Sequence, residues 1–407
     1  MIAQRLFSRV DWDTEVFIRR KAAVILHKIT LAYNSMIIPE KLYDELPVAA
    51  QAAFSNLENA AKEREFQRSV ADLRGSLTKK KIKGSLYWYY QTKDPDGKTQ
   101  QVYLGPEGPL IHEFINARND PTKIQSAAHL ARLSASAVAL GCANIAPKHG
   151  RVIKRIAEHG FFKAGGVLAG THAFLAYQNL FGIRWHVGQM TMDLDFAHPG
   201  KNVTIAFPHQ IKVDMHSALT SLNMGFIPVH GQARFKKADE PDFDVDFLTT
   251  RTRAGDSPIE VKSLGVSLQP LKFMELAFEQ PVQTVLLLNS GPVLVSVPNP
   301  AFFEFHKLIV SVERRAQNPL KSSKDMAQAA ALLDYYLNHN TTLLLDAYAH
   351  VLSRGPGWKQ RVNAGLKNLD AAARHLQIPG RLQAAISAHE IDEGMAFTNR
   401  GAARPRQ

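Results

Sequence analysis

Apolar and polar residues follow a helical period through most of the first 160 residues. In residues 1–75 apolar side chains recur three to four positions apart, and residues 126–141 are rich in Ala and Leu. Residues 151–162 place apolar side chains on one side and basic ones opposite, which is typical of an amphipathic helix. The pattern therefore predicts a helical N-terminal region over residues 1–160.

The pattern changes to a β-type one within residues 76–105. Two runs rich in aromatic, Val and Thr residues, GSLYWYYQT and KTQQVYLGP, flank the turn-forming residues 94–97, DPDG. This arrangement predicts a β-hairpin. The hairpin is expected to be basic, because a lysine run leads into it: Lys79, Lys80, Lys81 and Lys83.

The aromatic residues of this hairpin have two interpretations. Alternation along a strand puts Trp88 and Tyr90 on one face and Tyr87 and Tyr89 on the other. With the nearby lysines, Trp88 or Tyr90 could stack a base while the charges hold phosphates. The alternative is a small sheet that packs its aromatic side chains on neighbouring helices, which is the commoner use of such side chains. Both interpretations stay open.

Residues 161–300 differ again, because strand-like and helix-like runs alternate along them. This alternation predicts an α/β core. Residues 301–395 return to a helical pattern, and the tail RGAARPRQ at 400–407 is expected to be disordered. The predicted organisation is a helical region over 1–160, an α/β core over 161–300 and a helical C-terminal region over 301–407.

Composition indicates the cellular compartment and the class of binding partner. The 407 residues are 45% apolar and 21% charged, which suits a soluble globular protein of two or three domains. The lone cysteine, Cys142, excludes an internal disulfide, and neither a signal peptide nor a membrane span is recognisable. We therefore expect a cytoplasmic protein. Its net charge of +12 favours polyanionic partners such as nucleic acid or nucleotide phosphates.

A candidate anion site lies in the run FFKAGGVLAGTHAFLAY. The apolar residues 167–169 end at Gly170 and Thr171, and a helical pattern through Phe174 and Tyr177 follows. A strand that turns on glycine into a helix presents free backbone N–H groups and the positive end of the helix dipole, which favour phosphate. Gly170 allows close approach of a ligand, and Thr171 can cap the helix and donate a hydroxyl.

Two neighbouring aspartates supply candidate metal ligands. In the strand-like run TMDLDFA, Asp193 and Asp195 project to the same side, while Met192, Leu194 and Phe196 are expected to enter the core. Adjacent unpaired carboxylates repel each other, and a hard divalent cation removes that repulsion. The pair therefore predicts a site for a divalent ion.

A third carboxylate comes from the run FDVDFL. Asp246 lies between Val245 and Phe247 on a strongly apolar strand and is expected to complete the cluster. Asp244, on the same strand face, is a rival for this place. Burying a carboxylate without a partner is costly, so three of them in apolar strands favour a metal site over solvated strand ends.

The order of these features resembles the DNA polymerase beta-like nucleotidyltransferase superfamily, in which a glycine turn precedes Asp-x-Asp and a further strand aspartate. The runs VLAGTHAFLAY, TMDLDFA, VDFLTT, VPNPAFFEFHKLIV, KSSKDMAQAAALL and RGPGWK are similar to a bacterial family of nucleotidyltransferase-fold proteins with no settled substrate. The similarity covers about residues 165–358 and is weaker in the hairpin. It implies an α/β, or α+β, core with a mixed sheet, flanked by helical regions and the small basic hairpin.

The resemblance also implies roles for single residues. Asp193, Asp195 and Asp246 match carboxylates that hold Mg²⁺ or Mn²⁺, and Gly170 and Thr171 match the nucleotide-binding glycine motif. The chain departs from the family where threonine and histidine follow the glycine, since members often have Gly-Gly or Gly-Ser. The expected activity moves a nucleoside monophosphate from an NTP, such as ATP, to an acceptor hydroxyl on a nucleic acid, a protein or a small molecule.

Charged and imidazole side chains outside the aspartate cluster complete the candidates. Lys307 and Lys324, in the helical segment after the core, are candidates to contact the β- and γ-phosphates. A solvated basic helix face is the other interpretation of these lysines. His172 and His306 lack the ligand spacing of a zinc site, so we interpret both as structural.

Two other functions stay open. A nucleic-acid-binding protein would use the hairpin and the basic surface while its core stays catalytically idle, although intact carboxylates argue against that. A toxin or defence component that modifies RNA or a partner protein would share the transfer chemistry and differ in substrate.

Overall fold

The structure, a computed structural model, describes most of the chain from residue 41 onward. The described residues are 41–67, 76–93, 99–109, 111–112, 115–116, 122–189, 191–200, 213–229, 231–253 and 255–401. By internal contacts the chain divides into residues 1–41 and 42–407, and the description below concerns the second unit. Predictions for residues 1–40, 68–75 and 402–407 lie outside the described residues, and the domain boundaries predicted at 160 and 300 stay predictions.

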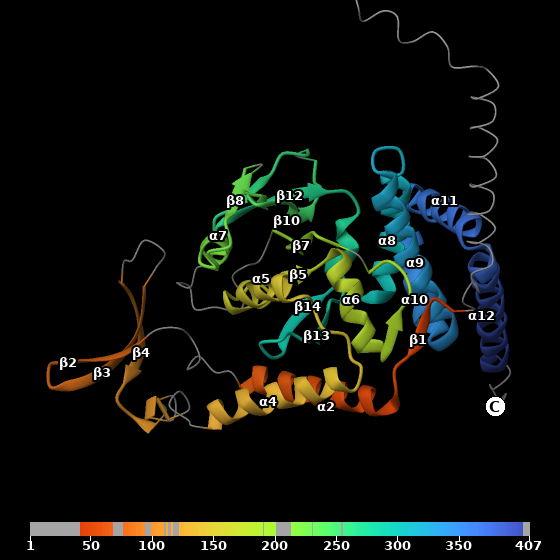
Figure 1. Ribbon diagram of the computed structural model, residues 1–407. Coiled ribbons are helices and arrows are strands. Elements are labelled where there is room, and N and C mark those ends of the chain that lie inside the picture. The colour runs from red at the N-terminus through yellow and green to blue at the C-terminus, as the bar shows by residue number, and fades with distance from the viewer. Residues whose placement is uncertain are drawn as a thin grey trace, which may run out of the picture. The chain divides into compact units, whose positions relative to one another are not determined.

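A seven-stranded sheet with parallel and antiparallel pairs forms the α/β core (Figure 1). Its strands are β5 (Val167–Leu168), β7 (Leu194–Ala197), β8 (Phe226–Val229), β9 (Arg234–Lys237), β10 (Glu240–Thr250), β11 (Ile259–Val261) and β12 (Val266–Leu271). β10 pairs in parallel with β7 and β12, whereas β5, β9 and β11 join antiparallel to their neighbours and β8 continues from β9. The predicted fold class, an α/β core with a mixed sheet between helical regions, is confirmed.

Apolar residues alternate with aspartates along the two central strands, β7 and β10. Leu194, Phe196, Val245 and Phe247 have no exposed surface, and Phe196 stacks on Phe247 with ring centroids 5.8 Å apart. Burying each such phenylalanine contributes about 1.5–3 kcal/mol. Because successive strand side chains point to opposite faces, packing this apolar set into the core turns the intervening aspartates to the other face.

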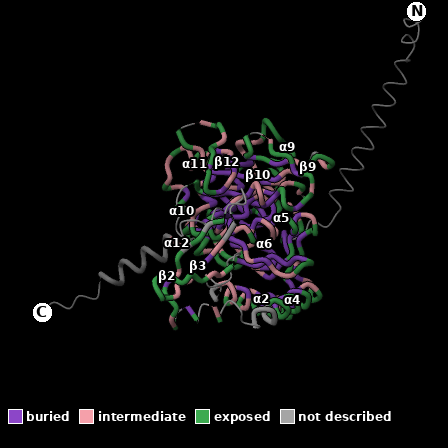
Figure 2. Tube along the Cα trace, turned by 90° about the vertical axis from the view of Figure 1, so that its left-hand side faces the viewer, coloured by how far each residue is buried: buried purple, intermediate pink, exposed green. Residues whose placement is uncertain are grey.

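Three helices belong to this region: α5 (Pro147–Glu158), α6 (Gly170–Phe181) and α7 (Met215–Thr220). The amphipathic pattern of α5 is confirmed, since Val152, Ile153 and Ile156 are fully buried. α6 contacts β7, and α5 contacts α7. Figure 2 shows buried residues concentrated around α5, α6 and β10. The core therefore lies between these helices and the sheet.

The N-terminal helices contribute a second, smaller core. The elements involved, together with one further strand pair, are α2 (Val48–Gln67), α4 (Thr122–Ala139), β13 (Val282–Leu286) with β14 (Val293–Val297), and β1 (Tyr43–Glu45) with β6 (Ile183–Trp185). α2 and α4 lie side by side (Figure 1). Their Phe54, Leu57 and Leu130 cluster with Val285 and Leu287 at the β13 end. The helical content predicted for the described part of residues 1–160 is confirmed.

A three-stranded antiparallel sheet contains the lysine run: β2 (Ser76–Ile82), β3 (Ser85–Lys93) and β4 (Thr99–Pro106). The predicted hairpin is confirmed as β3–β4, although its turn at residues 94–97 lies outside the described residues. β2 was not predicted, because lysine is a poor strand former; as an edge strand, however, it can carry lysines readily. Tyr90 is only 3% exposed, so the prediction that it could stack a base is wrong, whereas Trp88 is half-buried.

The C-terminal region is helical, as predicted. Its helices, with one short 3₁₀ turn, are α8 (Pro300–Arg314), α9 (Pro319–His339), α10 (Thr341–Ser353), α11 (Pro356–Ala372), η3 (Arg374–Leu376) and α12 (Ile378–Gly401). A further 3₁₀ turn, η2 (Met274–Phe278), precedes β13. Asn299, Asn318 and Asn340 cap α8, α9 and α10 by accepting backbone N–H bonds. Among the helices that the structure describes, none is both long and apolar enough to cross a membrane.

Candidate functional site

A tight strand-to-helix turn brings the backbone of α6 against a carboxylate of the sheet. β5 ends at Leu168, Ala169 is the N-cap and α6 begins at Gly170, whose φ is +60°. A Cβ built on Gly170 would lie 1.9 Å from Oδ2 of Asp195, so a side chain here would collide with the carboxylate. The backbone N–H of Ala169 also donates to the Asp195 carbonyl at 2.8 Å. The predicted need for glycine is therefore explained by a close approach within the protein as well as by its left-handed backbone.

Thr171 lies in the first turn of α6, not at its cap. The N-cap residue is Ala169, which makes no side-chain cap bond, so the prediction that Thr171 caps the helix is wrong. The Thr171 hydroxyl accepts a bond from Nε2 of Gln328 at 3.3 Å, and the same amide donates to the Gly188 carbonyl at 2.8 Å. Gln328, on α9, is fully buried and was not predicted from the sequence.

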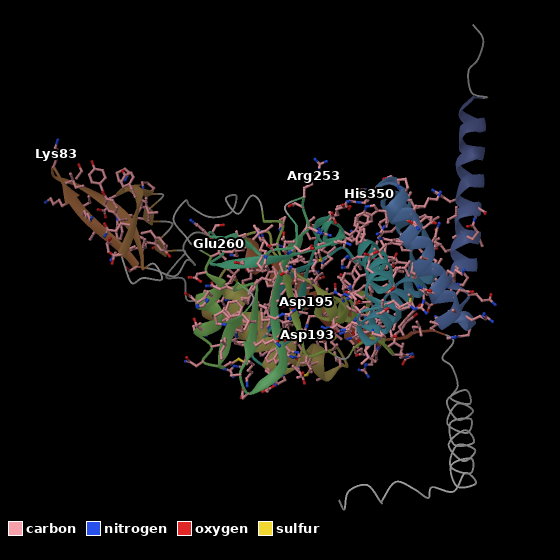
Figure 3. All side chains as sticks on the ribbon, turned by 90° about the horizontal axis from the view of Figure 1, so that it is seen from above. Lys83, Asp193, Asp195, Arg253, Glu260 and His350 are labelled. Carbon is pink, nitrogen blue, oxygen red and sulfur yellow. The ribbon has the colours of Figure 1, made fainter. Side chains whose placement is uncertain are left out.

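The first aspartate pair straddles the start of β7. Asp195 is on the strand, whereas Asp193 precedes Leu194, the first strand residue. Met192 is 45% exposed, so the prediction that it enters the core is wrong; Leu194 and Phe196 do so. Figure 3 shows Asp193 and Asp195 close together at the site. Both carboxylates thus reach one region, although the strand begins later than predicted.

Asp246 lies beside Asp195, on the neighbouring strand of the sheet. The two residues are partners in the parallel register of β10 and β7, so their side chains project from the same face. Asp244 is opposite Lys236 of β9 instead, and Arg234 and Lys236 lie within 3.7 and 3.5 Å of its carboxylate. Position therefore favours Asp246 over its rival Asp244 as the third carboxylate.

One cavity, of about 560 Å³, collects the predicted site residues. Its walls include every one of them: Gly170, Thr171, Asp193, Asp195, Asp246, Lys307 and Lys324. Asp244 does not line it. Further charged side chains on the walls are Arg234, Lys236, Arg314, Lys321 and Asp325. The structure therefore brings the seven residues together, and their individual roles stay predictions.

Two cationic side chains that the sequence did not single out bind the carboxylates. Arg234 holds Asp246 with both a Nε–Oδ1 contact of 2.5 Å and a Nη2–Oδ2 contact of 2.9 Å. Lys321, from the first turn of α9, donates to Oδ2 of Asp193 at 2.8 Å. The register of β9 places Arg234 directly opposite Asp246, so a prediction of the β9–β10 pairing would have found it.

Lys307 is buried rather than part of a solvated helix face. Its Nζ donates to Oδ1 of Asp325 at 2.7 Å and lies 5.2 Å from the Phe303 ring centroid. Asp325 accepts a second bond from Nη1 of Arg314 at 2.9 Å. One carboxylate on α9 therefore fixes two cations from α8 at the cavity wall. The solvated interpretation of Lys307 is wrong.

Burial and neighbouring charges shift the protonation of the aspartates. Burial, with the like charge of Asp193, raises the pKa of Asp195 despite the nearby Lys307. Burial raises the pKa of Asp246 to about 6, even though the hydrogen bond from Arg234 acts in the opposite direction. Both carboxylates are therefore poorly solvated in their charged form, and a cation in the cavity would stabilise that form.

The pKa values of two α9 lysines at the cavity, Lys321 and Lys324, are shifted in opposite directions. Burial opposes the charge of Lys321, but the bond to Asp193 outweighs it and leaves the Lys321 pKa raised. Burial and the nearby charge of Lys307 lower the pKa of Lys324. Anionic phosphate in the cavity would favour the charged form of Lys324.

The two histidines make hydrogen bonds within the protein. His172 Nε2 lies 3.0 Å from Nδ1 of His149, and burial lowers the His172 pKa to about 3. His306 Nδ1 lies 3.0 Å from the carbonyl oxygen of Phe273, and burial lowers the His306 pKa to about 4. Both rings are therefore neutral at pH 7.

The three aspartates have the oxygen donors that a divalent ion needs, but they are not arranged as a preformed metal site. Within the residues that the structure describes, no group of three His, Cys, Asp or Glu side chains is arranged to hold a metal ion. Arg234 and Lys321 occupy the oxygens of Asp246 and Asp193. Mg²⁺ and Mn²⁺ prefer hard oxygen donors such as the carboxylates that line this cavity. In the protein alone, Arg234 and Lys321 supply the positive charge beside these carboxylates. The residues therefore fit such an ion once these cations move aside.

Comparisons with known proteins bear on the same region. Residues 147–353, about half of the chain, match a family model described as Nucleotidyltransferase. Among solved structures, the chain is similar to an antigenic nucleotidyltransferase-like protein from Paracoccidioides brasiliensis, with 12% identity and a TM-score of 0.25 over 55% of this chain and 95% of that chain. No curated protein matches the chain significantly. The matched residues include all seven of the predicted site residues.

Proposed function

This chain belongs to the nucleotidyltransferase family, and we propose that it transfers a nucleoside monophosphate from an NTP to an acceptor hydroxyl and releases pyrophosphate. The observation that carries the proposal is the pairing of Asp195 with Asp246 across parallel strands, beside Gly170. Carboxylates for a divalent ion and cations for phosphate share one cavity with them. This combination suits phosphoryl chemistry, in which positioning and charge stabilisation provide most of the catalysis.

The nucleotide phosphates would bind between α6 and the α8–α9 pair. The start of α6 at Gly170 offers backbone N–H groups and the positive end of a helix dipole. Lys307 is fixed by Asp325 at the cavity wall. Lys324 on the next helix is the second candidate for the β- and γ-phosphates. Thr171 would donate its hydroxyl, because Gln328 already donates to that oxygen.

Asp193, Asp195 and Asp246 would hold Mg²⁺ or Mn²⁺. When bound, such an ion polarises the reacting phosphoryl group and neutralises its developing charge. Arg234 and Lys321 would then release their carboxylates and be available to the phosphates.

Asp246 is also the candidate to accept the proton of the acceptor hydroxyl. Without an ion in the cavity, burial raises its pKa to about 6; a bound cation would lower that pKa and keep Asp246 ionised at neutral pH, as a proton acceptor must be. Transfer of that proton to Asp246 leaves the acceptor oxygen free to attack the α-phosphorus while pyrophosphate departs.

The acceptor class is inferred from the net charge of the chain rather than from the site residues. The net charge of +12 favours an acidic acceptor, so nucleic acid is the first class to test and a protein hydroxyl the second. A protein that binds nucleic acid with a catalytically idle core is the alternative function.

The test is incubation of the full chain with each labelled NTP, Mg²⁺ or Mn²⁺, and total RNA and protein extracts. Asp193→Asn and Asp195→Asn keep the size of the side chain and remove its charge. Activity should fall by orders of magnitude, because ion stabilisation is worth several kcal/mol and each 1.36 kcal/mol is about tenfold in rate. Asp242→Asn, an exposed position on the same strand as Asp246, is the matched control and should retain activity.

Thermal melting separates loss of chemistry from loss of fold. Burial and Asp193 raise the pKa of Asp195, which means that its charge is unfavourable in the folded protein; Asp195→Asn should therefore melt no lower than wild type. Wild type should gain melting temperature with NTP and metal together, and the variant should gain little. Equal transfer by both Asn variants would place the active site elsewhere. Wild type that neither transfers nor binds NTP with metal would favour the idle-core alternative.

A further inference from the structure

The small sheet β2–β3–β4 has two unlike faces. One face carries Trp88 and the buried Tyr90. On the other face the register places Lys80 opposite Tyr87 and Tyr89 opposite Tyr103. Tyr103 is 54% exposed. The most exposed aromatic side chain, Tyr103, is thus on the face opposite to the one that the sequence suggested, although Trp88 is half-buried like Tyr87 and Tyr89.

The three tyrosines on the Tyr103 face form a contiguous cluster. The Tyr103 ring centroid lies 6.1 Å from that of Tyr87 and 5.6 Å from that of Tyr89. Nζ of Lys80 lies 4.8 Å from the Tyr89 ring centroid and donates to Gln101 at 2.6 Å. We call these four residues, Lys80, Tyr87, Tyr89 and Tyr103, the tyrosine face.

The strands β2 and β3 beside the tyrosine face carry positive charge alone, whereas an exposed acidic residue, Glu107, follows β4. Residues 76–93 contain five lysines and no Asp or Glu. All residues from Lys79 to Ser85 are exposed, and Figure 3 shows Lys83 projecting from the β2–β3 turn. A partner of this face therefore needs negative charge, and flat apolar groups if it is to use the rings.

We propose that the tyrosine face binds single-stranded nucleic acid. Unpaired bases stack on the tyrosine rings, and the lysines of β2 and its turn contact the phosphates. Duplex nucleic acid is a poorer partner, because its bases are already stacked and their faces are covered. An acidic peptide would satisfy the lysines but leave the rings unused. The proposal concerns binding alone and does not rest on nucleotide transfer.

Tyr103 allows the sharpest test, because two substitutions differ in the ring alone. Tyr103→Phe keeps a ring, whereas Tyr103→Val removes it, and both residues favour strands. Binding of fluorescent dT₁₂ and rU₁₂ to the full chain is measured by anisotropy, without NTP or metal. Tyr103→Val should weaken binding about tenfold, in keeping with loss of one stacked base, and Tyr103→Phe should bind like wild type.

Charge is tested by salt dependence. Lys83→Ala should lower the slope of log affinity against log salt concentration by about one, as expected for loss of one phosphate contact. Lys359→Ala, at an exposed position on α11, is the matched control and should leave the slope unchanged. Comparison of dT₁₂ with rU₁₂ shows whether DNA or RNA is preferred, and the substitution pattern with either supports the proposal.

Several results would overturn it. One is wild-type affinity in Tyr103→Val with a normal circular dichroism spectrum. Another is equal affinity for a duplex, and a third is full competition by polyglutamate at matched charge, which would indicate a general anion surface. Asp195→Asn should bind the oligonucleotides normally, so failure of this proposal and failure of nucleotide transfer are distinguishable.

Discussion

Gly170→Ala is the substitution whose consequence the geometry defines most sharply. A methyl group at this position would lie 1.9 Å from Oδ2 and 2.8 Å from Cγ of Asp195. Real Cβ atoms essentially never come within 3.0 Å of another atom, so the carboxylate must shift by at least about 1.1 Å, the difference between 3.0 and 1.9 Å. The alternative is movement of the start of α6, which would displace the same site from its other side.

Two separate costs follow from this substitution. The left-handed backbone, with φ of +60°, costs an alanine about 1–2 kcal/mol in stability. Displacement of Asp195 affects function instead, because a misplacement of about 1 Å can reduce a rate about 100-fold. We expect Gly170→Ala to lower both the free energy of unfolding and the rate of nucleotide transfer.

Gly225→Ala isolates the first cost. Gly225 has a similar φ of +75°, and a Cβ there would meet nothing within 4 Å. Urea unfolding and the labelling assay are measured for both variants beside wild type. Gly225→Ala should lose about 1–2 kcal/mol of stability and keep its activity, whereas Gly170→Ala should lose more stability and about 100-fold in rate. Equal stability losses with normal transfer in Gly170→Ala would show that the close approach to Asp195 is unimportant.

Three further predictions concern buried charges. Asp325→Ala leaves the buried Lys307 without its 2.7 Å partner and should cost about 3–5 kcal/mol of unfolding free energy in urea; a loss below about 1 kcal/mol would contradict this. The depressed His306 pKa, about 4 against 6.5, means that the unfolded state takes up the proton first, so stability falls as pH drops below about 6.5. His306→Asn, which keeps a donor, should reduce the loss between pH 7 and 5 by about 2 kcal/mol, and an unchanged loss would refute the assignment. Glu304 has no exposed surface and a strongly raised pKa. The unfolded state therefore loses the proton first, and the free energy of unfolding falls by about 1.4 kcal/mol per pH unit as pH rises above 4.5, the ordinary value. Glu304→Gln should remove this slope, and parallel stability curves for wild type and variant would contradict the prediction.

Local patterns in the sequence were sufficient for the centre of the fold. The apolar residues flanking Asp246 predicted a strand that lies within β10, and the glycine turn at Gly170 predicted the passage from β5 to α6. The run before Asp195 misled, because alternation continues through residues 191–193 while the pairing with β10 begins only at Leu194. Hydrogen bonding to a neighbouring strand determines where β7 starts, and a single run of residues does not contain that information.

The edge strand β2 shows a related limit. Its three consecutive lysines have low intrinsic strand preference, yet β3 offers a continuous partner from Ser76 to Ile82. Alternation separated Trp88 from Tyr89 correctly, but it could not tell which of the two faces would be covered.

In the candidate site, too, local sequence patterns identify some residues, whereas long-range contacts determine the others. Asp195 and Asp246 could be predicted because each lies in a short apolar run that marks its strand, and Asp193 because it stands two residues before Asp195. Arg234 and Lys321 could not, since their partners Asp246 and Asp193 are 12 and 128 residues away. Lys307 was predicted, but its burial depends on Asp325 from another helix. Cationic residues of this cavity are thus identified by strand pairing and helix packing, which the sequence alone leaves undetermined.

These cations also explain why carboxylates can lie together without a ready metal cluster. Burial disfavours the charged forms of Asp195 and Asp246, and the like charge of a neighbour, Asp193 for Asp195 and Asp195 for Asp246, adds to that cost. Arg234 and Lys321 offset the repulsion by binding Asp246 and Asp193. In the proposed function, a nucleotide with its metal ion would bring both signs of charge: the ion would replace Arg234 and Lys321 at the carboxylates, and the phosphates would bind these two cations. Every charged group would then stay paired during the exchange, which avoids the cost of leaving a partly buried charge without a partner.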